Sequence, residues 1–158
     1  RYGAEWKSTI NFDPFGWRGA KLDARFQIQR SRLDDPLTGQ KREIRNSLLP
    51  LADLTLRHDV HGTDWAWGGG LSYAFSALNY RLTEVGRLWE GPVWAYAYIE
   101  HKDVLGLTVR ATVNNILGAD SMWDRIVYAG RRTGPIAFRE DRDRVIGPIF
   151  SFQVRGRF

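Results

Sequence analysis

Two stretches of the sequence combine histidine with carboxylates at spacings that could ligate a metal ion. They are His58, Asp59, His61 and Asp64 in the first stretch and Glu100, His101 and Asp103 in the second. A metal site needs ligands that converge from several directions, and no second cluster completes either stretch. Solvated turns are therefore the favoured interpretation, and we expect no metal or other cofactor.

Near the end of the chain, acidic residues interleave with arginines: Glu140, Asp141 and Asp143 with Arg139, Arg142 and Arg144. Paired carboxylates can do general acid–base work, but mixed charges along an extended strand more often form a solvated face. The three glycines at 68–70 lie within an alternating segment that no helix follows. A bend or a close-packed point is therefore favoured there over a phosphate-binding loop.

Other signatures of catalysis are missing from the sequence, which has no Gly-x-Ser-x-Gly motif, no P-loop and no cysteine nucleophile. We therefore expect that the protein is not an enzyme. The absence of Cys also excludes disulfides and thiolate metal sites, and it fits an exported protein whose folding needs no redox step.

The elements that carry these residues are indicated first by composition. Seven Trp, six Tyr, eight Phe and 16 Gly against one Met suit strands and tight turns better than helices. The net charge of +5 is compatible with nucleic acid, an anionic membrane surface or an acidic ligand. No stretch approaches the roughly 18 apolar residues of a membrane helix. The chain starts at Arg1 with an alternating pattern already under way at Ala4 and Trp6, so we expect a piece of a longer protein.

Apolar residues recur with a period of two, which is the period of a strand and not of a helix. In the last segment Phe150, Phe152 and Val154 alternate with Ser151 and Gln153. The same alternation runs through residues 21–29, 52–57 and 107–114. The sequence therefore predicts an all-β protein in which one face of each strand is apolar.

Turn-forming residues divide this pattern into strands. We predict turns at 13–16, 34–39, 61–64, 86–92, 102–106 and 133–135. We predict an antiparallel up-and-down meander of about seven long strands: 2–12, 19–33, 40–60, 65–82, 92–101, 106–132 with a break near Gly118, and 136–158. An odd number of strands cannot close as an antiparallel barrel, so we expect an open, curved sheet with bare edges at 2–12 and 145–158.

Strand length separates a soluble sandwich from a membrane barrel, because alternation alone fits both. Segments 40–60 and 136–158 run about 20 residues, against five or six in a typical globular strand, and span on the order of 70 Å. A barrel wall that continues above a bilayer accommodates such strands. If Phe158 marks the periplasmic end, the short turns 13–18, 61–64 and 102–106 gather there. The charged stretches 40–46, 125–132 and 139–144 then gather at the opposite rim.

Each strand of such a wall has a lipid face and a lumen face. The pattern places aromatic residues outward near strand ends, as in an interfacial girdle; these are Trp6, Phe12, Trp65, Trp67, Tyr73 and Phe158. Polar residues would face the lumen, where they could pair with one another, grip a plug or simply be wetted; these are Asp23, Arg25, Gln27, Gln29, Asp53, Arg57, Arg110, Thr112, Gln153 and Arg155. The face of Trp94, Tyr96 and Tyr98 stays open because their alternates are also apolar.

Charged residues at the rim suggest a further contact. Arginines could bind lipopolysaccharide phosphates there as arginine binds other phosphates; these are Arg42, Arg45, Arg131 and Arg132.

The last fifty residues resemble the end of a known family. The run Gly106–Gly118, with Asn115-Ile116-Leu117 inside it, resembles the penultimate strand of TonB-dependent outer-membrane receptors, where an Asn-Leu-Phe-like motif is common. The final run 147–158 resembles the last strand of that family. Its Phe150, Phe152, Val154, Gly156 and Phe158 look like the signal that the outer-membrane insertion machinery reads.

This resemblance implies that residues 1–158 are the C-terminal portion of a 22-stranded barrel, with the plug domain and the N-terminal strands absent. The implied function is TonB-dependent uptake of a scarce nutrient, such as a siderophore-iron complex or an oligosaccharide, at the bacterial outer membrane. The implied partners are outer-membrane lipids, lipopolysaccharide and the insertion machinery, together with the protein's own plug domain and TonB through the missing N-terminal part. A porin-like barrel without energy coupling is the alternative, followed by a soluble β-rich binding module; no nucleic acid is expected as a partner.

Overall fold

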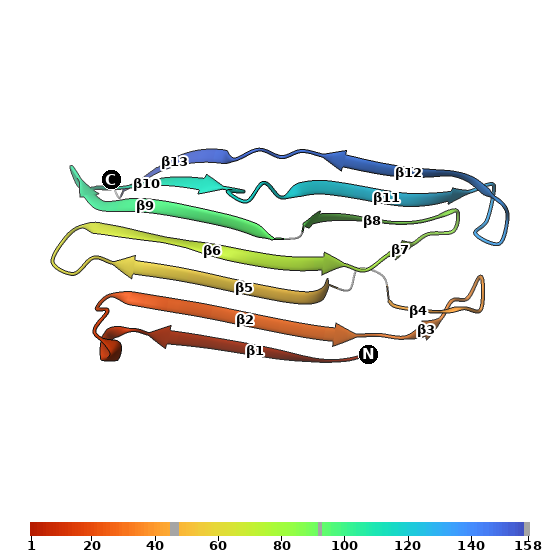
Figure 1. Cartoon of the computed structure of the whole chain (residues 1–158), viewed down its shortest axis with the longest axis horizontal. Helices are drawn as coiled ribbons and strands as arrows, with labels where there is room; N and C mark the ends of the chain where they lie inside the picture. The colour runs from red at the N-terminus through yellow and green to blue at the C-terminus, as the bar shows by residue number, and fades with distance from the viewer. Residues whose placement is uncertain (45–47, 92, 157–158) are drawn as a thin grey trace.

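The computed structural model describes residues 1–44, 48–91 and 93–156 of the chain (Figure 1). Every element of regular structure in these ranges is a strand, apart from a single 3-10 turn at Asp13–Phe15. The Asp-Pro-Phe-Gly sequence explains that turn, because Pro14 presets its backbone and Gly16 ends it at a φ of +87°. Within the described ranges there is no helix whose length and apolar character would let it cross a bilayer.

The larger sheet has seven antiparallel strands in the order β1-β2-β5-β6-β9-β10-β13. Its strands are β1 (Tyr2–Asn11), β2 (Ala20–Arg30), β5 (Leu48–Asp59), β6 (Trp65–Ser76), β9 (Trp94–Val104), β10 (Leu107–Asn114) and β13 (Ile149–Arg155). A second sheet has the order β12-β11-β8-β7. Its strands are β7 (Asn79–Tyr80), β8 (Glu84–Gly91), β11 (Asp120–Tyr128) and β12 (Ile136–Arg144). A two-stranded hairpin joins β3 (Leu33–Asp34) to β4 (Lys41–Arg42).

The predicted all-β fold and its antiparallel seven-stranded sheet are confirmed. Each strand of that sheet neighbours the next one that the chain supplies to it, as in an up-and-down meander. Its edges are β1 and β13, and no sheet among the described residues closes on itself.

Most of the long predicted strands are interrupted along their length. Segment 136–158 forms β12 and β13 with residues 145–148 between them, and segment 106–132 breaks at 115–119, around Gly118 as expected. Segment 40–60 forms β4 and β5, and part of the predicted strand, 45–47, lies outside the described residues. The interruptions separate the second sheet and the hairpin from the larger sheet.

The predicted turn at 86–92 is wrong. Residues Glu84–Gly91 form β8, which pairs with both β7 and β11. The chain reverses earlier, where the amide of Arg81 donates a hydrogen bond to the oxygen of Glu84 at 2.9 Å. Glycine often marks a turn, but Gly86 instead lets the neighbouring strand β11 approach closely. A Cβ at this position would lie 2.6 Å from the Cβ of Arg125 on the neighbouring strand.

The two ends of the strands differ in character (Figure 1). The turns that follow β1, β5 and β9 lie together at one end, beside the end of β13. The β3–β4 hairpin and the turns of β7–β8 and β11–β12 lie at the other end. The short turns and the charged stretches therefore fall at opposite ends, as the sequence predicts for all of these stretches except residues 45–46, which are not described.

The buried core is small because the larger sheet is one layer thick. Among the described residues the buried apolar side chains are Ala20, Ala24, Ala66, Ala95, Tyr98 and Ala119. Alanine burial contributes little hydrophobic free energy compared with the 1.5–3 kcal/mol or so of a large side chain. Many large apolar side chains of this sheet are therefore left exposed by the described residues.

Candidate functional site

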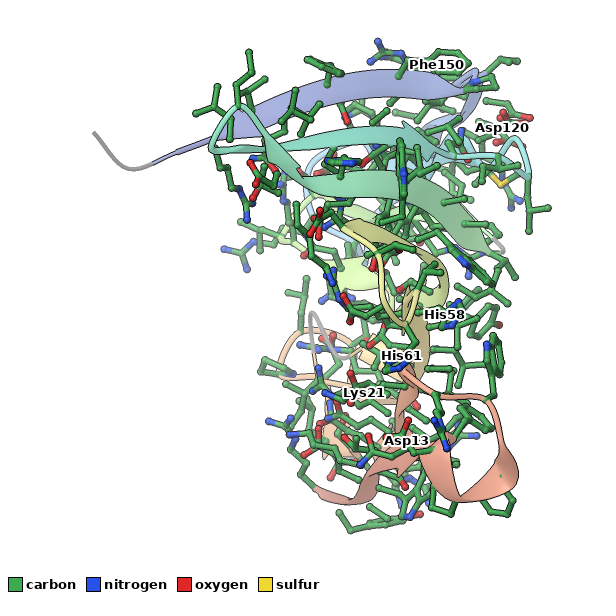
Figure 2. The ribbon with its side chains drawn as sticks, turned by 90° about the vertical axis from the view of Figure 1, so that its left-hand side faces the viewer. Asp13, Lys21, His58, His61, Asp120 and Phe150 are labelled. Carbon is green, nitrogen blue, oxygen red and sulfur yellow. The ribbon has the colours of Figure 1, made fainter. Side chains whose placement is uncertain are left out.

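Two adjacent rows across the larger sheet define its faces. One row runs from β1 to β13 through Ile10, Leu22, Leu56, Gly69, Ala97, Val113 and Phe150. The next row runs through Asn11, Lys21, Arg57, Gly68, Tyr98, Thr112 and Ser151. Because neighbouring residues of a strand point to opposite sides, the first row belongs to an apolar face and the second to a polar face. Figure 2 looks along the strands and shows Lys21 and His58 on opposite sides of the ribbon.

The apolar face is exposed at the residues that resemble an insertion signal. Phe150, Phe152 and Val154 of β13 leave 80%, 71% and 50% of their surface open. Their neighbours on β10 are Val113, Ala111 and Val109, so the apolar character continues inward from the edge. Gly156 follows β13 against Leu107. Phe158 lies outside the described residues.

Aromatic side chains gather on the apolar face near the short turns. Trp67 lies 6.2 Å from Trp17 and 5.3 Å from His58, measured between ring centroids. Trp65 meets the edge of His101 at 4.6 Å. Trp6 stacks on Phe26 further along the sheet at 5.4 Å. All three expected interfacial tryptophans therefore lie on this face.

The histidines do not form the metal cluster that was weighed above. His58 belongs to β5 and packs among indoles, whereas His61 lies in the exposed turn that follows. His101 packs on Trp65, and its Nδ1 accepts a hydrogen bond from the amide of Asp103. No group of three or more metal-ligating side chains occurs within the described ranges.

The polar face is crossed by a network of charges centred on Arg57. Its guanidinium donates to both carboxylate oxygens of Asp59 at 2.9 Å and to Glu100 on β9 at 2.9 Å. Lys102 reaches Asp59 at 2.7 Å, and Arg110 lies 3.8 Å from Glu100. These contacts join β5, β9 and β10. The sequence did not place Glu100 and Lys102 on this face, because the strand that carries them alternates ambiguously.

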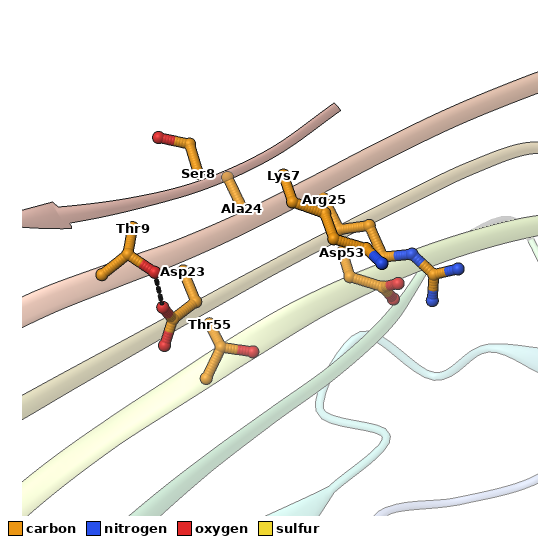
Figure 3. Close-up of a pocket in the computed structure, with 8 residues that line it drawn as sticks. All are labelled: Lys7, Ser8, Thr9, Asp23, Ala24, Arg25, Asp53 and Thr55. Atoms are coloured by element: carbon orange, nitrogen blue, oxygen red, sulfur yellow. Dashed lines mark hydrogen bonds between the residues drawn. The ribbon is translucent and has the colours of Figure 1, made fainter. Parts of the chain in front are cut away.

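A second group of polar residues lies over β1, β2 and β5 (Figure 3). Thr9 donates to Asp23 at 2.5 Å, and Arg25 donates to Glu5 at 2.7 Å. Ser72 of β6 donates to Asp53 at 2.6 Å. Of these side chains, Thr9, Asp23, Arg25 and Asp53 border an open hollow of about 350 Å³.

The other residues expected to face the lumen lie on the same polar face. Gln27 accepts a hydrogen bond from Arg25, and Gln29 accepts one from Arg1. On β10 and β13, Arg110 pairs with Gln153, Thr112 pairs with Ser151, and Thr108 pairs with Arg155. The guanidinium of Arg110 lies 3.4 Å from the centre of the Tyr98 ring.

The open question of the face of residues 94–98 is answered by glycines on the neighbouring strand. A Cβ at Gly68 would lie 2.7 Å from the hydroxyl of Tyr98, and a Cβ at Gly70 would lie 2.6 Å from the ring of Tyr96. Both tyrosines therefore lie over glycines on the polar face. The three consecutive glycines of β6 are a close-packed point, with two tyrosines filling the space that their missing side chains leave.

Asn115 makes a cluster of hydrogen bonds where β10 ends and the chain passes to the second sheet. Its backbone has a φ of +55°, and the residue is fully buried. Its side chain accepts from the amide of Ala119 at 2.6 Å and donates to the oxygen of Ala119 at 2.9 Å. It also donates to the oxygen of Ile146, in the interruption between β12 and β13. Asn tolerates the left-handed region better than most residues, which accounts for Asn in this motif.

Asp35 makes a junction at the opposite end of the molecule that sequence reasoning missed. Its carboxylate, only 2% exposed, accepts from Arg42 at 2.5 Å and from Arg132 at 2.7 Å. The amides of Leu37 and Thr38 donate to it as well. Burial disfavours the ionised carboxyl, but these hydrogen bonds outweigh burial and hold the pKa of Asp35 well below its ordinary value.

This junction engages two of the four rim arginines that were expected to bind phosphate. Arg42 and Arg132 are committed to Asp35, and both also lie over the ring of Tyr80 at 4.6 and 5.4 Å. Arg131 is exposed, and Arg45 lies outside the described residues. The proposed phosphate contact therefore cannot use all four arginines freely.

Comparison with known proteins adds no family to these observations. No family model matches the chain, and neither a curated protein nor a solved structure matches it.

Proposed function

We propose that the larger sheet is part of the wall of an outer-membrane β-barrel, and that the protein is a transport receptor of the TonB-dependent type. One observation carries the proposal. The row from Ile10 to Phe150 is apolar across all seven strands, while the adjacent row from Asn11 to Ser151 is polar. Lipid outside and water inside are the environments that such a single layer needs.

The exposed apolar surface supports a lipid environment. A soluble monomer rarely leaves a contiguous apolar patch of more than a few hundred Å² open to water. Here Ile99, Phe150 and Phe152 are each more than half exposed. A second sheet would have to cover them in a soluble sandwich, and the second sheet of the described chain continues the strands lengthwise instead of covering this face (Figure 1).

The height of the apolar band also suits a bilayer. On β6 the outward residues begin at Trp65 and end at Phe75, which contacts Trp89 in a tilted arrangement with ring centroids 5.4 Å apart. These ten steps span about 34 Å along the strand at about 3.4 Å per residue. A strand tilt of about 40° lowers this to roughly 26 Å, close to the apolar band of about 25 Å in outer-membrane barrels. Aromatic residues lie at both limits of the band.

The polar face supports a water-filled or plugged interior. Arg57 bonds to Asp59 on its own strand and to Glu100 on β9, and these side chains leave about a tenth to two fifths of their surface open. Charged rows of this kind are stable where water or another polar surface meets them, and they are costly against lipid. The unpaired edges of β1 and β13 are where further strands of the wall would join.

The energy-coupled receptor is favoured over a porin by the resemblance of residues 106–118 and 147–158. The contacts of Asn115 give that resemblance a structural basis, because its side chain joins the end of β10 to Ile146, in the segment that leads into β13. A soluble binding module is the third candidate, and it requires the Phe150 face to be buried.

Paired spin labels test the membrane wall directly. The 158 residues contain no Cys, so Leu71→Cys and Ser72→Cys place single labels on opposite faces of β6, in the middle of the band. In the full-length protein in bilayers, we expect the label at 71 to collide with oxygen, which dissolves in lipid. The label at 72 should collide with a water-soluble nickel chelate. Protection of the label at 71 from both reagents would indicate a soluble sandwich and end the proposal.

Conductance and energy dependence separate the receptor from the porin. Full-length protein in a planar bilayer should show almost no steady current if a plug fills the barrel, whereas a porin conducts continuously. Growth on the transported nutrient should also stop when a protonophore collapses the inner-membrane gradient. A stable open channel together with protonophore-insensitive uptake would select the porin.

A further inference from the structure

A polar groove lies where the larger sheet meets the second sheet. Its main part, about 470 Å³, is lined by Ser76 at the end of β6, by Asn79, Arg81 and Glu84, and by Trp123 and Arg125 of β11. A smaller hollow of about 290 Å³ shares Ser76 with it and adds Trp94 and Ser72. Ser72 and Trp94 belong to the polar face of the larger sheet, opposite each other on β6 and β9. The groove therefore continues the polar face beyond the apolar band.

The polar groups of the groove are held in fixed positions by one another. Glu84 accepts from Arg81 at 2.7 Å and from Arg125 at 3.1 Å, through different oxygens. Arg125 also donates its Nε to Glu140 at 2.5 Å. Its Nη2 hydrogens bond to nothing among the described residues, so they can serve another acceptor. Rigid placement of this kind lowers the entropy cost of binding.

The groove also offers acceptors and flat apolar surface. The hydroxyl of Ser76 and the carboxylate of Glu84 line it as acceptors. Trp123 is 37% exposed, and the Arg125 guanidinium lies 5.1 Å from its ring centroid. Ala77 and Gly86 also line the groove. Its lining therefore combines charged groups, small residues and an exposed indole.

These features together select one class of ligand. A purely apolar ligand would leave the Arg81–Glu84–Arg125 charges desolvated, which is costly. A bare anion would meet the carboxylate of Glu84, which lies between the two guanidinium groups. A sugar ring has C–H faces that pack on indoles and a rim of hydroxyls, each of which both donates and accepts. It matches a groove in which donors and acceptors alternate beside aromatic rings.

We propose that this groove binds an oligosaccharide, with Trp123 and Trp94 packing on sugar rings and with Arg125 and Glu84 bonding to sugar hydroxyls. The inference rests on the proposed function for its biological setting, because it names the substrate class that the receptor captures at the outer end of the barrel.

The test is binding of the full-length protein, in detergent, to an array of neutral and uronic-acid oligosaccharides, with a ferric hydroxamate chelate as the competing class of ligand. We expect at least one oligosaccharide group to bind. Arg125→Gln and Trp123→Ala should each weaken that binding at least tenfold, and Trp123→Phe, which keeps a ring, should recover most of it. Arg139→Gln, an exposed arginine of the adjacent strand β12, is the matched control and should bind like the parent.

Three results would overturn the oligosaccharide assignment: an empty array, sugar binding that Arg125→Gln and Trp123→Ala leave unchanged, or chelate binding that these variants abolish. Resistance of the folded barrel to SDS at room temperature shows that each variant has folded. If the spin labels at 71 and 72 behave as expected while the array is empty, the substrate class alone is wrong. If the labels contradict the membrane wall, the proposed function is wrong whatever the array shows.

Discussion

The guanidinium of Arg132 donates a hydrogen bond to the carboxylate of Asp35 at 2.7 Å, across 97 positions of sequence. This contact joins the β3–β4 hairpin to the loop between β11 and β12. Because Asp35 also binds Arg42 and two amides of its own turn, one carboxylate organises the hairpin and fastens it to a distant loop. The strands are therefore held together at this end of the molecule without a shared sheet.

Removal of the Asp35 charge should destabilise the loop between β11 and β12 more than the turn of the β3–β4 hairpin. Asp35→Asn keeps a side-chain oxygen for the amides of Leu37 and Thr38 but leaves the buried Arg132 without its counter-charge. Breaking a buried pair in this way costs about 3–5 kcal/mol. Hydrogen exchange at the Arg132 amide should accelerate at least a hundredfold. Asp34→Asn, at the exposed neighbour, is the control, and equal acceleration in both variants would contradict the role of Asp35.

The junction should resist mild acid. A carboxyl whose pKa is lowered by folding stabilises the folded state above its unfolded pKa, near 3.8, and loses that contribution only as the pH falls toward the lower folded value. Exchange at the Arg132 amide, corrected for its intrinsic pH dependence, should thus stay slow at pH 5 and rise only in strong acid. Opening of the loop between pH 5 and 7 would show that another group controls it.

The stability that Asn115 provides should depend on both its backbone conformation and its side-chain amide. Asn115→Gly relieves the φ of +55° but loses the three side-chain hydrogen bonds, whereas Asn115→Ala loses these bonds and keeps the strain. At about 1 kcal/mol for each bond and for the strain, both variants should lower the unfolding temperature of the barrel, with alanine below glycine. Asn114→Ala, one position earlier, should have the smaller effect. An alanine variant as stable as the parent would contradict this account.

Gly68 and Gly70 of β6 should differ in whether removal of the facing tyrosine ring makes room for the methyl group of an alanine. A Cβ at Gly70 is blocked mainly by the Tyr96 ring at 2.6 Å, whereas a Cβ at Gly68 is blocked by the backbone oxygen of Leu56 at 2.2 Å. Tyr96→Ala should therefore rescue part of the loss caused by Gly70→Ala, and Tyr98→Ala should not rescue Gly68→Ala. A double-mutant cycle on the folded fraction measures this coupling. Gly147→Ala, in open space, is the neutral control.

The membrane wall predicts a depth-dependent cost of charge on the apolar face. Leu71→Arg, near the middle of the band, should cost about 2–4 kcal/mol, and Trp65→Arg, at its limit, should lose only about 0–1 kcal/mol of electrostatic stability beyond the loss of the ring. Ser72→Arg, on the polar face, should be tolerated. Unfolding of the full-length protein in lipid vesicles by guanidinium measures all three variants. Equal costs at positions 65 and 71 would argue against a bilayer around this face.

The strands and most turns could be predicted from the sequence because both depend on local chemistry. The alternation of Phe150, Phe152 and Val154 reports one exposed face directly, and Asp13-Pro14 forces a turn wherever it occurs. Gly86 gave the wrong answer because a glycine is equally suited to a turn and to a crowded strand. Only its neighbour Arg125 on β11 distinguishes the two cases.

The sites that join distant segments could not be predicted, since nothing local marks the partner. Asp35 reads as an ordinary turn residue, and its burial depends on Arg132 arriving from a loop 97 positions away. The sequence does contain a weak signal for the face on which the β9 tyrosines lie. Gly68 and Gly70 alternate on one face, so bulky side chains on the next strand must fill the space above them.

The meander order of the larger sheet has a consequence for how such a protein can change over evolutionary time. Every strand of the larger sheet bonds only to the strands that the chain supplies to that sheet before and after it, although β3–β4, β7–β8 and β11–β12 come between some of them in the chain. Duplication or deletion of one hairpin would therefore keep the direction of every remaining strand and change the partners only of the strands that flank it. In the proposed barrel, the gene can lengthen or shorten in steps of two strands, and the circumference of the cylinder changes with it.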